Sequence, residues 1–384
     1  MLIYFLIFIL LVLLIGFCIY RIFIIWRDLE PVNQCPLQIH TFDGKDSPYH
    51  PSVLFFEGGW NHYKYYMVQT PFFCGYPFRG KNYRDRYECP SVYVSNDGIQ
   101  WLEVSVNPID TLGANEIENK DYFSDPHLVF TGDAIECWYR INHRYGDYEN
   151  DNNVELLRKR TFDGVNWTER ETLADLTTVA HPLGNMVISQ SVLFLKNRYH
   201  MWYVDSISLG QREIAFSSSS DGLHWISKRI CKLYGADINP WHIDVALIDN
   251  VFWLTIFDRI NLTLWRSTDG LDFRFYSVLL SPSKIIGSFY AQDLYRACLI
   301  KNNELYRLYF SADDSIKTSI GVMEGKCPDE LHIISIGSDQ YRTFSQFLYV
   351  LFYIRIRDIV NILKRMLYRH FIKPIKSIIK DKTR

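Results

Sequence analysis

The sequence predicts an all-β fold, a five-bladed β-propeller with an N-terminal transmembrane helix and a C-terminal basic amphipathic helix. The first observation behind this prediction is a repeated turn pattern, and repeats of this size are typical of propellers. The second is a series of hairpins in which aromatic and β-branched runs are broken by turn dipeptides. The third is an aromatic content of 16%, which suits sheets packed face to face and also suits sugar-binding surfaces.

The turn pattern consists of a hydroxyl residue, an Asp-Gly pair, two variable residues and a large aromatic residue. The Asp-Gly pair supplies a positive φ angle for a tight turn, and the Asp carboxylate can accept hydrogen bonds from backbone amides. The aromatic ring then holds the returning strand against the sheet. The pattern describes how the chain is built and carries no chemistry. Its copies are Ser95–Trp101, Thr161–Trp167, Ser220–Trp225 and Ser267–Phe273.

Five predicted hairpins divide residues 40–327 into five blades. After each of the first four hairpins, one strand leads into a copy of the turn pattern and another leads out, which makes a four-stranded blade. The fifth hairpin is followed by a degenerate copy. The hairpins are 53–56 with 63–69, 128–130 with 135–141, 192–195 with 199–204, 245–248 with 251–257, and 298–300 with 305–310.

Residues 1–27 are predicted to be a transmembrane anchor, joined to the propeller by a linker at residues 28–39. The run from Leu2 to Tyr20 is apolar without interruption, which is long enough to span a bilayer. No basic residue precedes it and no small-x-small pattern closes it, which favours an anchor over a cleaved signal peptide. Arg21 and Arg27 flank its C-terminal end, so the positive-inside rule predicts a single-pass protein with a cytoplasmic main domain.

Residues 338–384 are predicted to form a basic amphipathic tail on the membrane surface. From Tyr341 to Arg384 the chain carries eleven Lys or Arg and two acidic residues, with apolar residues at roughly helical spacing. Such a helix binds anionic membrane lipids; the alternative is a helix packed on the propeller with a solvated basic face. The net charge of −2 gives no argument for nucleic acid, so no nucleic-acid partner is predicted.

Neither a metal nor a cofactor is predicted from local motifs. The eight Cys residues include no Cys-x-x-Cys pair and no paired Cys/His spacing of the kind that holds zinc.

Candidate functional residues stand just before the first strand of each predicted blade. In a propeller the innermost strands begin around a central funnel, so these residues are expected to converge there. Glu88 precedes a third strand, which runs parallel to the first strand and begins on the same face. The other candidates are His50, Asp125 and His127, Gln190, Trp241 with His242 and Asp244, and Tyr295 with Arg296.

With these residues, the span 40–327 resembles the five-bladed β-propellers of the glycoside hydrolase superfamily, which include arabinanases and xylosidases, invertases, and mannoside phosphorylases. It is most similar to an uncharacterised, membrane-anchored bacterial branch. The stretches that carry the resemblance are His50-Pro51-Ser52-Val53, Glu88-Cys89-Pro90, Ser124-Asp125-Pro126-His127-Leu128, Trp241-His242-Ile243-Asp244-Val245 and Tyr295-Arg296.

The resemblance implies catalysis by carboxylates, because these hydrolases use an aspartate base or nucleophile, a glutamate acid and a third orienting carboxylate. Asp125 matches an aspartate that precedes a proline, whereas His50 stands in the place of the base and Gln190 in the place of the acid. Asp125 and Asp244 are therefore the leading catalytic pair, with Glu88 as the third carboxylate. The structural alternatives are that Asp125 caps a turn and that Glu88 is a charge at the rim.

The remaining candidates are assigned to substrate binding. Asp244 stands two residues after His242 on a strand, so both face one side and Asp244 is expected to orient that imidazole. Arg296 is expected either to pair with Asp244 or Asp293 or to hold a carboxylate or phosphate of the substrate. The substrate-binding set is His50, His127, Gln190, Trp241, His242, Tyr295 and Arg296.

Two functional hypotheses follow. The first is a membrane-anchored glycan-active enzyme, a glycosidase-like hydrolase or phosphorylase that acts on a surface polysaccharide, a lipid-linked glycan or a sugar phosphate, beside membrane-bound biosynthetic partners. The second is a non-catalytic carbohydrate-binding or scaffold propeller in a polysaccharide-biosynthesis complex, which Gln190 in place of a glutamate favours. A membrane structural protein is a third class, favoured only by a funnel filled with apolar side chains. Two funnel carboxyl groups roughly 5 to 10 Å apart would favour the enzyme.

Overall fold

The computed structural model describes residues 2–27, 34–72, 88–119, 121–143, 154–177, 181–184, 186–208, 211–283, 288–314 and 317–334. The chain divides into two compact units, one containing the N-terminal helix and the other containing the β-strands. The predicted tail at residues 338–384 and residues 28–33 of the predicted linker lie outside the described residues.

The N-terminal unit contains helix α1 (Leu2–Arg27), which is 26 residues long. Side chains are described for residues 9–24 of this helix. Within the described part of the chain, no helix is both long and apolar enough to cross a membrane. The anchor predicted for residues 1–27 stays a prediction.

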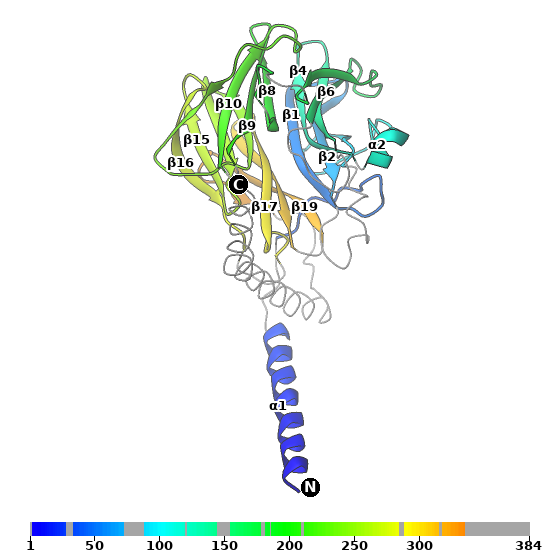
Figure 1. Cartoon of the computed structure of the whole chain (residues 1–384), viewed down its shortest axis with the longest axis vertical. Helices are drawn as coiled ribbons and strands as arrows, with labels where there is room; N and C mark the ends of the chain where they lie inside the picture. Colours follow the sequence, from blue (N-terminus) through cyan, green and yellow to red (C-terminus); the bar gives the residue numbers. More distant parts are fainter. Residues whose placement is uncertain are drawn as a thin grey trace, which may run out of the picture. The chain divides into compact units, whose positions relative to one another are not determined.

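The second unit is a five-bladed β-propeller, as the sequence predicts, with one antiparallel sheet for each blade (Figure 1). The first blade contains β1 (Pro48–Trp60), β2 (Tyr63–Pro71) and β3 (Ser91–Ser95). The second contains β4 (Tyr122–Phe130), β5 (Ile135–Asn142), β6 (Val154–Thr161) and β7 (Glu171–Asp175). The short helix α2 (Ala114–Asn119) precedes this second blade.

The other three blades repeat this order. The third contains β8 (Ile188–Leu195), β9 (Arg198–Ser208), β10 (Gln211–Ser219) and β11 (Arg229–Ile230). The fourth contains β13 (His242–Ile248), β14 (Val251–Phe257), β15 (Leu262–Ser267) and β16 (Asp272–Leu280), with β12 (Lys232–Tyr234) parallel to β16 at its outer edge. The fifth contains β17 (Asp293–Asn302), β18 (Leu305–Asp313), β19 (Thr318–Gly325) and β20 (His332–Ile333).

The first strands of the blades close a ring around the axis. β1 contacts β4 and β17, β8 contacts β4 and β13, and β13 contacts β17. Apolar side chains fill the spaces between blades, where five hydrophobic clusters each join two neighbouring blades. Trp138 is fully buried between the second and third blades.

The predicted Asp-Gly turns lie between the third and fourth strand positions of the blades. In the first copy, Asp97 Oδ1 accepts hydrogen bonds from the amides of Ile99 and Gln100, both at 2.8 Å. Gly98 has a φ of 72° and donates its amide to Ser95 Oγ at 2.8 Å. The third copy corrects the predicted pattern, because the hydroxyl that accepts the glycine amide belongs to Ser219 and not to Ser220.

The turn of the first blade is also tied to the fifth blade. Arg307 Nη1 donates to the carbonyl oxygen of Asp97 at 2.7 Å, and the Tyr309 hydroxyl donates to that of Gly98 at 3.0 Å. A Cβ atom on Gly98 would collide with both of these side chains. Gly98 is therefore required for the backbone conformation and for the contact that joins the first and last blades.

We expect Gly98→Ala to lower the free energy of unfolding by about 2 to 4 kcal/mol, because it adds a steric clash to the roughly 1 to 2 kcal/mol cost of a left-handed L-residue. Gly44 is the matched control, since its φ is 68° and nothing lies within 4 Å of an added Cβ. Gly44→Ala should lose only about 1 kcal/mol. Urea unfolding of both variants measures the difference, and equal losses would contradict the proposed role of Gly98.

Candidate functional site

The innermost strands carry β-bulges near the end where they enter the channel. Three non-glycine residues at these bulges adopt a positive φ: His50 at 55°, Asp125 at 52° and Ser189 at 51°. This conformation is unfavourable for L-residues, and both bulges and such residues gather at functional sites. His50, Asp125, His127, Gln190, His242, Asp244, Tyr295 and Arg296 thus lie inside the first strands, whereas Trp241 directly precedes β13 and Glu88 precedes β3. The register shifts fall between Tyr49 and Ser52, Ser124 and His127, Ile188 and Ser191, and Leu294 and Ala297.

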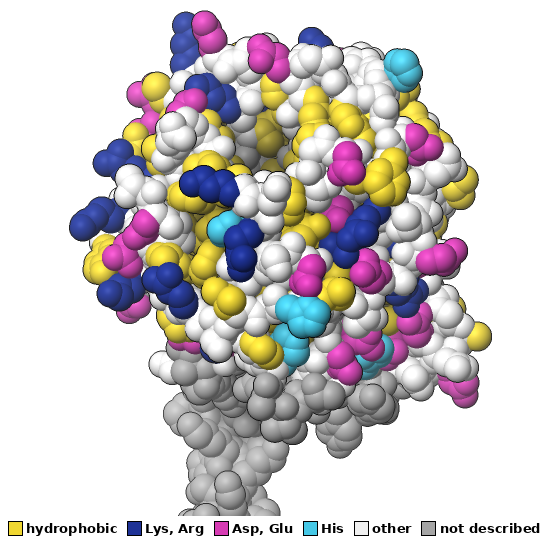
Figure 2. Space-filling model, turned by 90° about the horizontal axis from the view of Figure 1, so that it is seen from above, with side chains coloured by type: hydrophobic (Ala, Val, Ile, Leu, Met, Phe, Trp, Pro, Cys, Tyr) yellow, Lys and Arg dark blue, Asp and Glu magenta, His cyan; other side chains and the backbone are white. Residues whose placement is uncertain are grey.

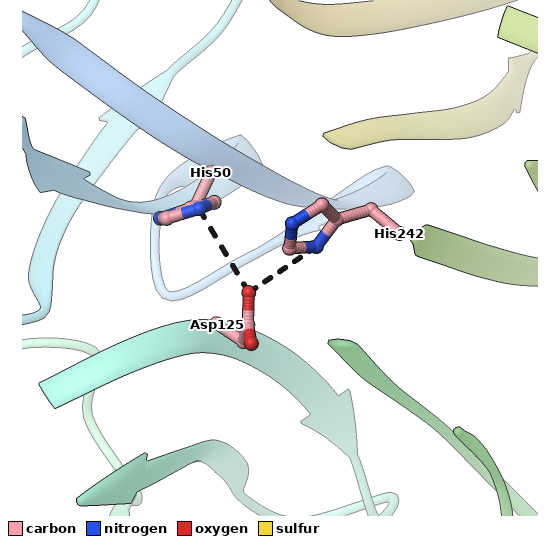
Figure 3. Close-up of side chains that lie close together, drawn as sticks. All are labelled: His50, Asp125 and His242. Atoms are coloured by element: carbon pink, nitrogen blue, oxygen red, sulfur yellow. Dashed lines mark ion pairs between the residues drawn. The ribbon is translucent and has the colours of Figure 1, made fainter. Parts of the chain in front are cut away.

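His50, Asp125 and His242 come from three blades and meet in the channel (Figure 3). Asp125 Oδ1 lies 3.8 Å from His50 Nε2 and 3.4 Å from His242 Nδ1. One ligand atom from each residue can be chosen so that all three lie within 4.8 Å of one another. The three residues are only 1% to 3% exposed. We call this group the His-Asp-His cluster.

Several polar atoms of the His-Asp-His cluster lack a hydrogen-bond partner among the described residues. These atoms are His50 Nε2, Asp125 Oδ1 and both ring nitrogens of His242. Buried polar atoms without a partner are costly, and native structures rarely keep several of them together. Since one such atom from each residue lies within 4.8 Å of the others, the three residues could together donate electron pairs to one ligand.

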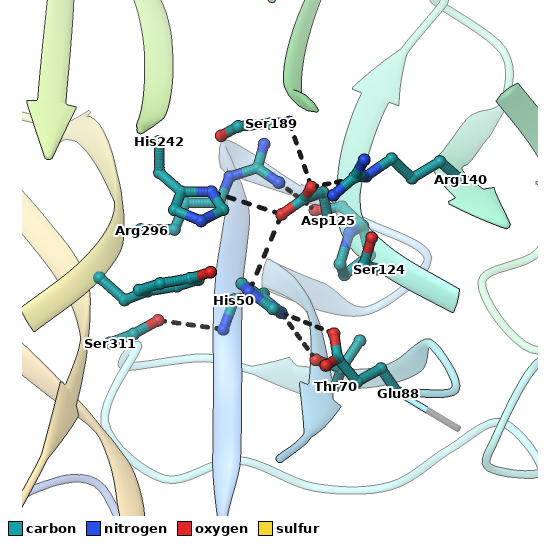
Figure 4. A network of polar contacts seen from close by, with 12 residues as sticks. His50, Thr70, Glu88, Ser124, Asp125, Arg140, Ser189, His242, Arg296 and Ser311 are labelled. Carbon is teal, nitrogen blue, oxygen red and sulfur yellow. Dashed lines mark hydrogen bonds and ion pairs between the residues drawn. The ribbon is translucent and has the colours of Figure 1, made fainter. Parts of the chain in front are cut away.

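The second carboxylate oxygen of Asp125 is held by the protein. Arg140 Nε donates to Asp125 Oδ2 at 2.8 Å, and the amide of Ser189 donates to the same atom at 3.1 Å (Figure 4). Gln190, which the resemblance places where an acid would stand, donates its side-chain amide to the backbone carbonyl of Asp125. Asp125 is therefore fixed through one oxygen and its own backbone, with the other oxygen directed at the two imidazoles.

The ring of His50 is oriented from its other nitrogen. His50 Nδ1 lies 3.0 Å from Thr70 Oγ1 and 3.6 Å from Glu88 Oε2. These two contacts orient the ring so that Nε2 faces Asp125. Glu88 thus stands on the far side of His50 from Asp125. It lies where it can orient that imidazole, as expected of the third, orienting carboxylate, and its catalytic role stays a prediction.

The protonation states of the cluster suit a cation. Burial lowers the pKa of His50 to about 4, although Asp125 opposes the shift. Burial also brings the pKa of His242 well below its ordinary value. Burial alone would raise the pKa of Asp125, but Arg140 and the two imidazoles bring it well below its usual range. At neutral pH the cluster is therefore two neutral imidazoles and one carboxylate, a donor set that divalent metals prefer.

A second polar layer follows further along the same strands. Asp244 Oδ1 lies 3.6 Å from His127 Nδ1 and not beside His242, so the expected orienting pair is wrong. Arg296 donates to the backbone carbonyl of Gln190 at 2.7 Å and lies 3.2 Å from His127 Nδ1. The Arg296 guanidinium group thus contacts backbone carbonyls and His127. The ion pair with Asp244, one of the alternatives that the sequence suggested, is replaced by these contacts.

A cavity of about 860 Å³ continues from this second layer toward the ends of the inner strands. His127 and Asp244 line it together with aliphatic residues such as Val245 and Leu299, whereas no residue of the His-Asp-His cluster does. Of the predicted catalytic pair, Asp244 lines this cavity and Asp125 does not.

Tyr295 and Trp241 border the His-Asp-His cluster. The ring centroid of Tyr295 lies 3.9 Å from that of His242. Trp241 Nε1 donates to the Tyr295 hydroxyl at 3.1 Å. Arg140 and Thr70 were not predicted from the sequence. Arg140 lies within an apolar strand, and a charged residue in such a strand indicates a buried carboxylate partner. This signal can be read from the sequence alone.

No protein-family profile matches the chain. A curated protein with similarity is the A type blood N-acetyl-α-D-galactosamine deacetylase of Flavonifractor plautii, which is 23% identical over 249 residues. The match covers 54% of this chain and 30% of that protein, so the chain spans less than a third of the length of its relative.

Solved structures share the fold. An N-acetylgalactosamine deacetylase from F. plautii in complex with blood group B trisaccharide has a TM-score of 0.62 at 20% identity, covering 76% of this chain and 95% of that chain. A family 43 β-xylosidase/α-arabinofuranosidase from a compost metagenome has a TM-score of 0.53 at 11% identity, covering 80% and 98%. A family 43 enzyme from Xanthomonas citri has a TM-score of 0.51 at 11% identity, covering 80% and 96%. The chain has the same five-bladed fold as these two family 43 glycoside hydrolases, as the resemblance predicted.

Asp244→Asn is expected to stabilise the protein at pH 7 to 8. Burial raises the pKa of Asp244 to about 6, partly offset by Arg296. The folded state therefore binds more protons than the unfolded state between about pH 4 and 6, and the free energy of unfolding falls as pH rises through this range. The neutral amide of Asn should remove this pH dependence and raise the free energy of unfolding by about 1 to 3 kcal/mol at pH 8.

Chemical unfolding at pH 4.5 and pH 8 tests this expectation. Asp249→Asn is the control, because Asp249 is exposed and paired with Lys301 at 2.6 Å, so its loss should not stabilise the fold. An Asp244→Asn variant that is less stable than the wild type at pH 8 would show that its charge is well compensated in the channel.

Proposed function

We propose that the chain is a metal-dependent glycan deacylase, which hydrolyses the N-acyl group of an amino sugar. The single observation that carries the proposal is the His-Asp-His cluster, in which one unpartnered ligand atom from each residue lies within 4.8 Å of the others. His50, Asp125 and His242 would hold one divalent ion. A metal ion bound there would supply a Lewis acid that polarises the acyl carbonyl group.

The surroundings of the cluster fit a metal. Ligating imidazoles in metalloproteins are oriented through their second nitrogen, and ligating carboxylates are themselves hydrogen-bonded. Thr70 and Glu88 contact the second nitrogen of His50. Arg140 and the Ser189 amide donate hydrogen bonds to Asp125. The donor set of two imidazoles and a carboxylate suits Zn²⁺, Fe²⁺ or Mn²⁺.

We assign Tyr295 the role of donating a hydrogen bond to the acyl carbonyl oxygen of the substrate. Its hydroxyl accepts a hydrogen bond from Trp241 Nε1, so the O–H proton remains available to donate to a substrate oxygen beside His242. Burial raises the pKa of Tyr295, which keeps this proton in place at neutral pH. A donor fixed beside a developing oxyanion stabilises the transition state of acyl hydrolysis.

The comparisons support the substrate class. The curated relative and one solved structure with the same fold are N-acetylgalactosamine deacetylases. Because the identity is low and the match covers a minor part of that relative, the transfer of this activity is part of our proposal.

Cleavage of a glycosidic bond is the second candidate, and one observation favours it. Asp244 is a buried acid with a pKa raised to about 6, and it lines the cavity, as a general acid would. The other cavity carboxylates are Glu57, Asp249 and Glu304, which are exposed. Ordinary glycosidases need two carboxylates around one bond, so this candidate ranks second.

We expect the full-length chain to bind one divalent ion and to release acetate from oligosaccharides that contain N-acetylglucosamine or N-acetylgalactosamine. Asp125→Asn and His242→Gln should each lower metal affinity by about 100-fold or more, because each removes a ligand. Asp244→Asn is the control and should keep the metal. Equilibrium dialysis with Zn²⁺ and Mn²⁺ measures binding, and acetate release with reducing-end analysis identifies the product.

New reducing ends without acetate would support the glycosidase candidate. Glycan binding with neither product and without a metal would support the carbohydrate-binding propeller.

We also propose that residues 1–27 anchor the chain in a membrane and that residues 338–384 rest on anionic lipids, as their sequences suggest. Deletion of residues 1–27 should release the protein from membranes washed with alkaline carbonate, because no long apolar segment would remain to hold it. Deletion of residues 338–384 should weaken binding of the anchor-free chain to phosphatidylserine vesicles but not to phosphatidylcholine vesicles. Full-length protein in the carbonate supernatant would contradict the anchor.

A further inference from the structure

Two arginines stack on Trp241 beside the His-Asp-His cluster. The guanidinium carbon of Arg212 lies 4.0 Å from the centroid of the indole ring, and that of Arg259 lies 3.9 Å from it. Trp241 immediately precedes His242, and the two ring centroids are 5.7 Å apart. We call Arg212, Trp241 and Arg259 the Arg-Trp-Arg cluster.

Separate elements bring the Arg-Trp-Arg cluster together beside His242. Arg212 is the second residue of β10, while Arg259 lies between β14 and β15 with a φ of 74°. Trp241 is fixed from two sides, because its amide donates to the carbonyl oxygen of Phe257 at 2.8 Å and its Nε1 donates to the Tyr295 hydroxyl. The indole is a rigid platform that holds the guanidinium groups near His242.

Arg259 brings an exposed positive charge to the cluster. Arg259 is exposed, and it forms no ion pair with a carboxylate in the part of the chain that the structure describes. The adjacent acid, Asp258, already accepts hydrogen bonds from the amides of Ile260 and Asn261, at 2.8 and 2.7 Å. Stacking on indole attracts a guanidinium group but leaves its N–H donors and its charge available.

The face of the molecule drawn in Figure 2 carries charges of both signs. It is hollowed, with basic, acidic and apolar side chains interspersed around the hollow. Among the residues that the structure describes, no broad field of one sign covers this face. A preference for charged ligands therefore depends on local groups, and the Arg-Trp-Arg cluster is such a group.

We propose that the Arg-Trp-Arg cluster is a subsite for an anionic group of the substrate, either a phosphate or the carboxylate of a uronic acid. This inference rests on the proposed function, since it places the anion next to the sugar whose N-acyl group is hydrolysed. Planar guanidinium groups bind both kinds of anion through paired hydrogen bonds. The substrate class is therefore an anionic glycan that contains an N-acylated amino sugar.

Calorimetric titration of the full-length chain with paired probes tests the subsite. The anionic probes are N-acetylglucosamine 1-phosphate and the disaccharide of glucuronic acid and N-acetylglucosamine. Their neutral counterparts are N-acetylglucosamine and N,N′-diacetylchitobiose. We expect each anionic probe to bind about 10-fold more tightly than its counterpart at low salt, with the preference reduced by added salt. The relative preference of the two anionic probes distinguishes a phosphate from a uronate.

The double variant Arg212→Met/Arg259→Met should bring the ratio of anionic to neutral affinity close to one and leave the neutral probes unchanged. Arg266→Met is the matched control, because Arg266 also stacks on an aromatic ring, that of Tyr276 at 4.9 Å, on another part of the propeller. It should keep the full preference. Equal affinities in the wild type, a preference that survives in the double variant, or no binding of any probe would each overturn the proposal.

Metal binding is measured on the same samples, so that the two proposals fail separately. A metal and acetate release without an anionic preference would overturn the subsite alone. An anionic preference lost in the double variant, in a protein that binds no metal, would support the subsite and overturn the deacylase.

Discussion

The buried charge of Asp125 is the constraint on which the channel depends. A carboxylate that is only 1% exposed would destabilise the fold by several kcal/mol without counter-charges and hydrogen bonds. Arg140 and the amide of Ser189 satisfy one of its oxygens. The other oxygen faces two imidazoles from two other blades. The closed ring of inner strands keeps these groups together, and the strained bulges at His50, Asp125 and Ser189 are a cost that a purely structural channel would not need.

The polar groups of the channel are divided into layers with different chemistry. At the start of the inner strands, the His-Asp-His cluster offers neutral nitrogens and one ionised carboxylate. In the next layer, Asp244 and His127 face a cavity that the cluster does not line. This separation argues against two carboxylates that act on one glycosidic bond. It favours a hydrolase that shares its fold with glycoside hydrolases and uses a metal at the position where they place carboxylates.

The sequence predicts the propeller because the signals for it are local. Each Asp-Gly turn is closed by hydrogen bonds within a few residues, and each hairpin is visible as two apolar runs around a turn dipeptide. The sequence also predicts that His50, Asp125 and His242 converge, since the first strands of a propeller all start at one end. It does not predict which side chains touch. Asp244 stands two residues from His242 but contacts His127, because packing between blades decides the partner. The sequence does not mark His50, Asp125 and His242 as a possible metal site, because each comes from a different blade and no local spacing joins them.

The most direct measurement is anomalous X-ray diffraction from crystals of the full-length chain soaked with Zn²⁺, compared with crystals of the Asp125→Asn variant. We expect one strong anomalous peak, about 2.0 to 2.2 Å from a nitrogen of His50, a nitrogen of His242 and an oxygen of Asp125. The peak should be absent from the variant. A channel with no peak, or a peak elsewhere with these three side chains unchanged, would contradict the metal site and the deacylase that depends on it.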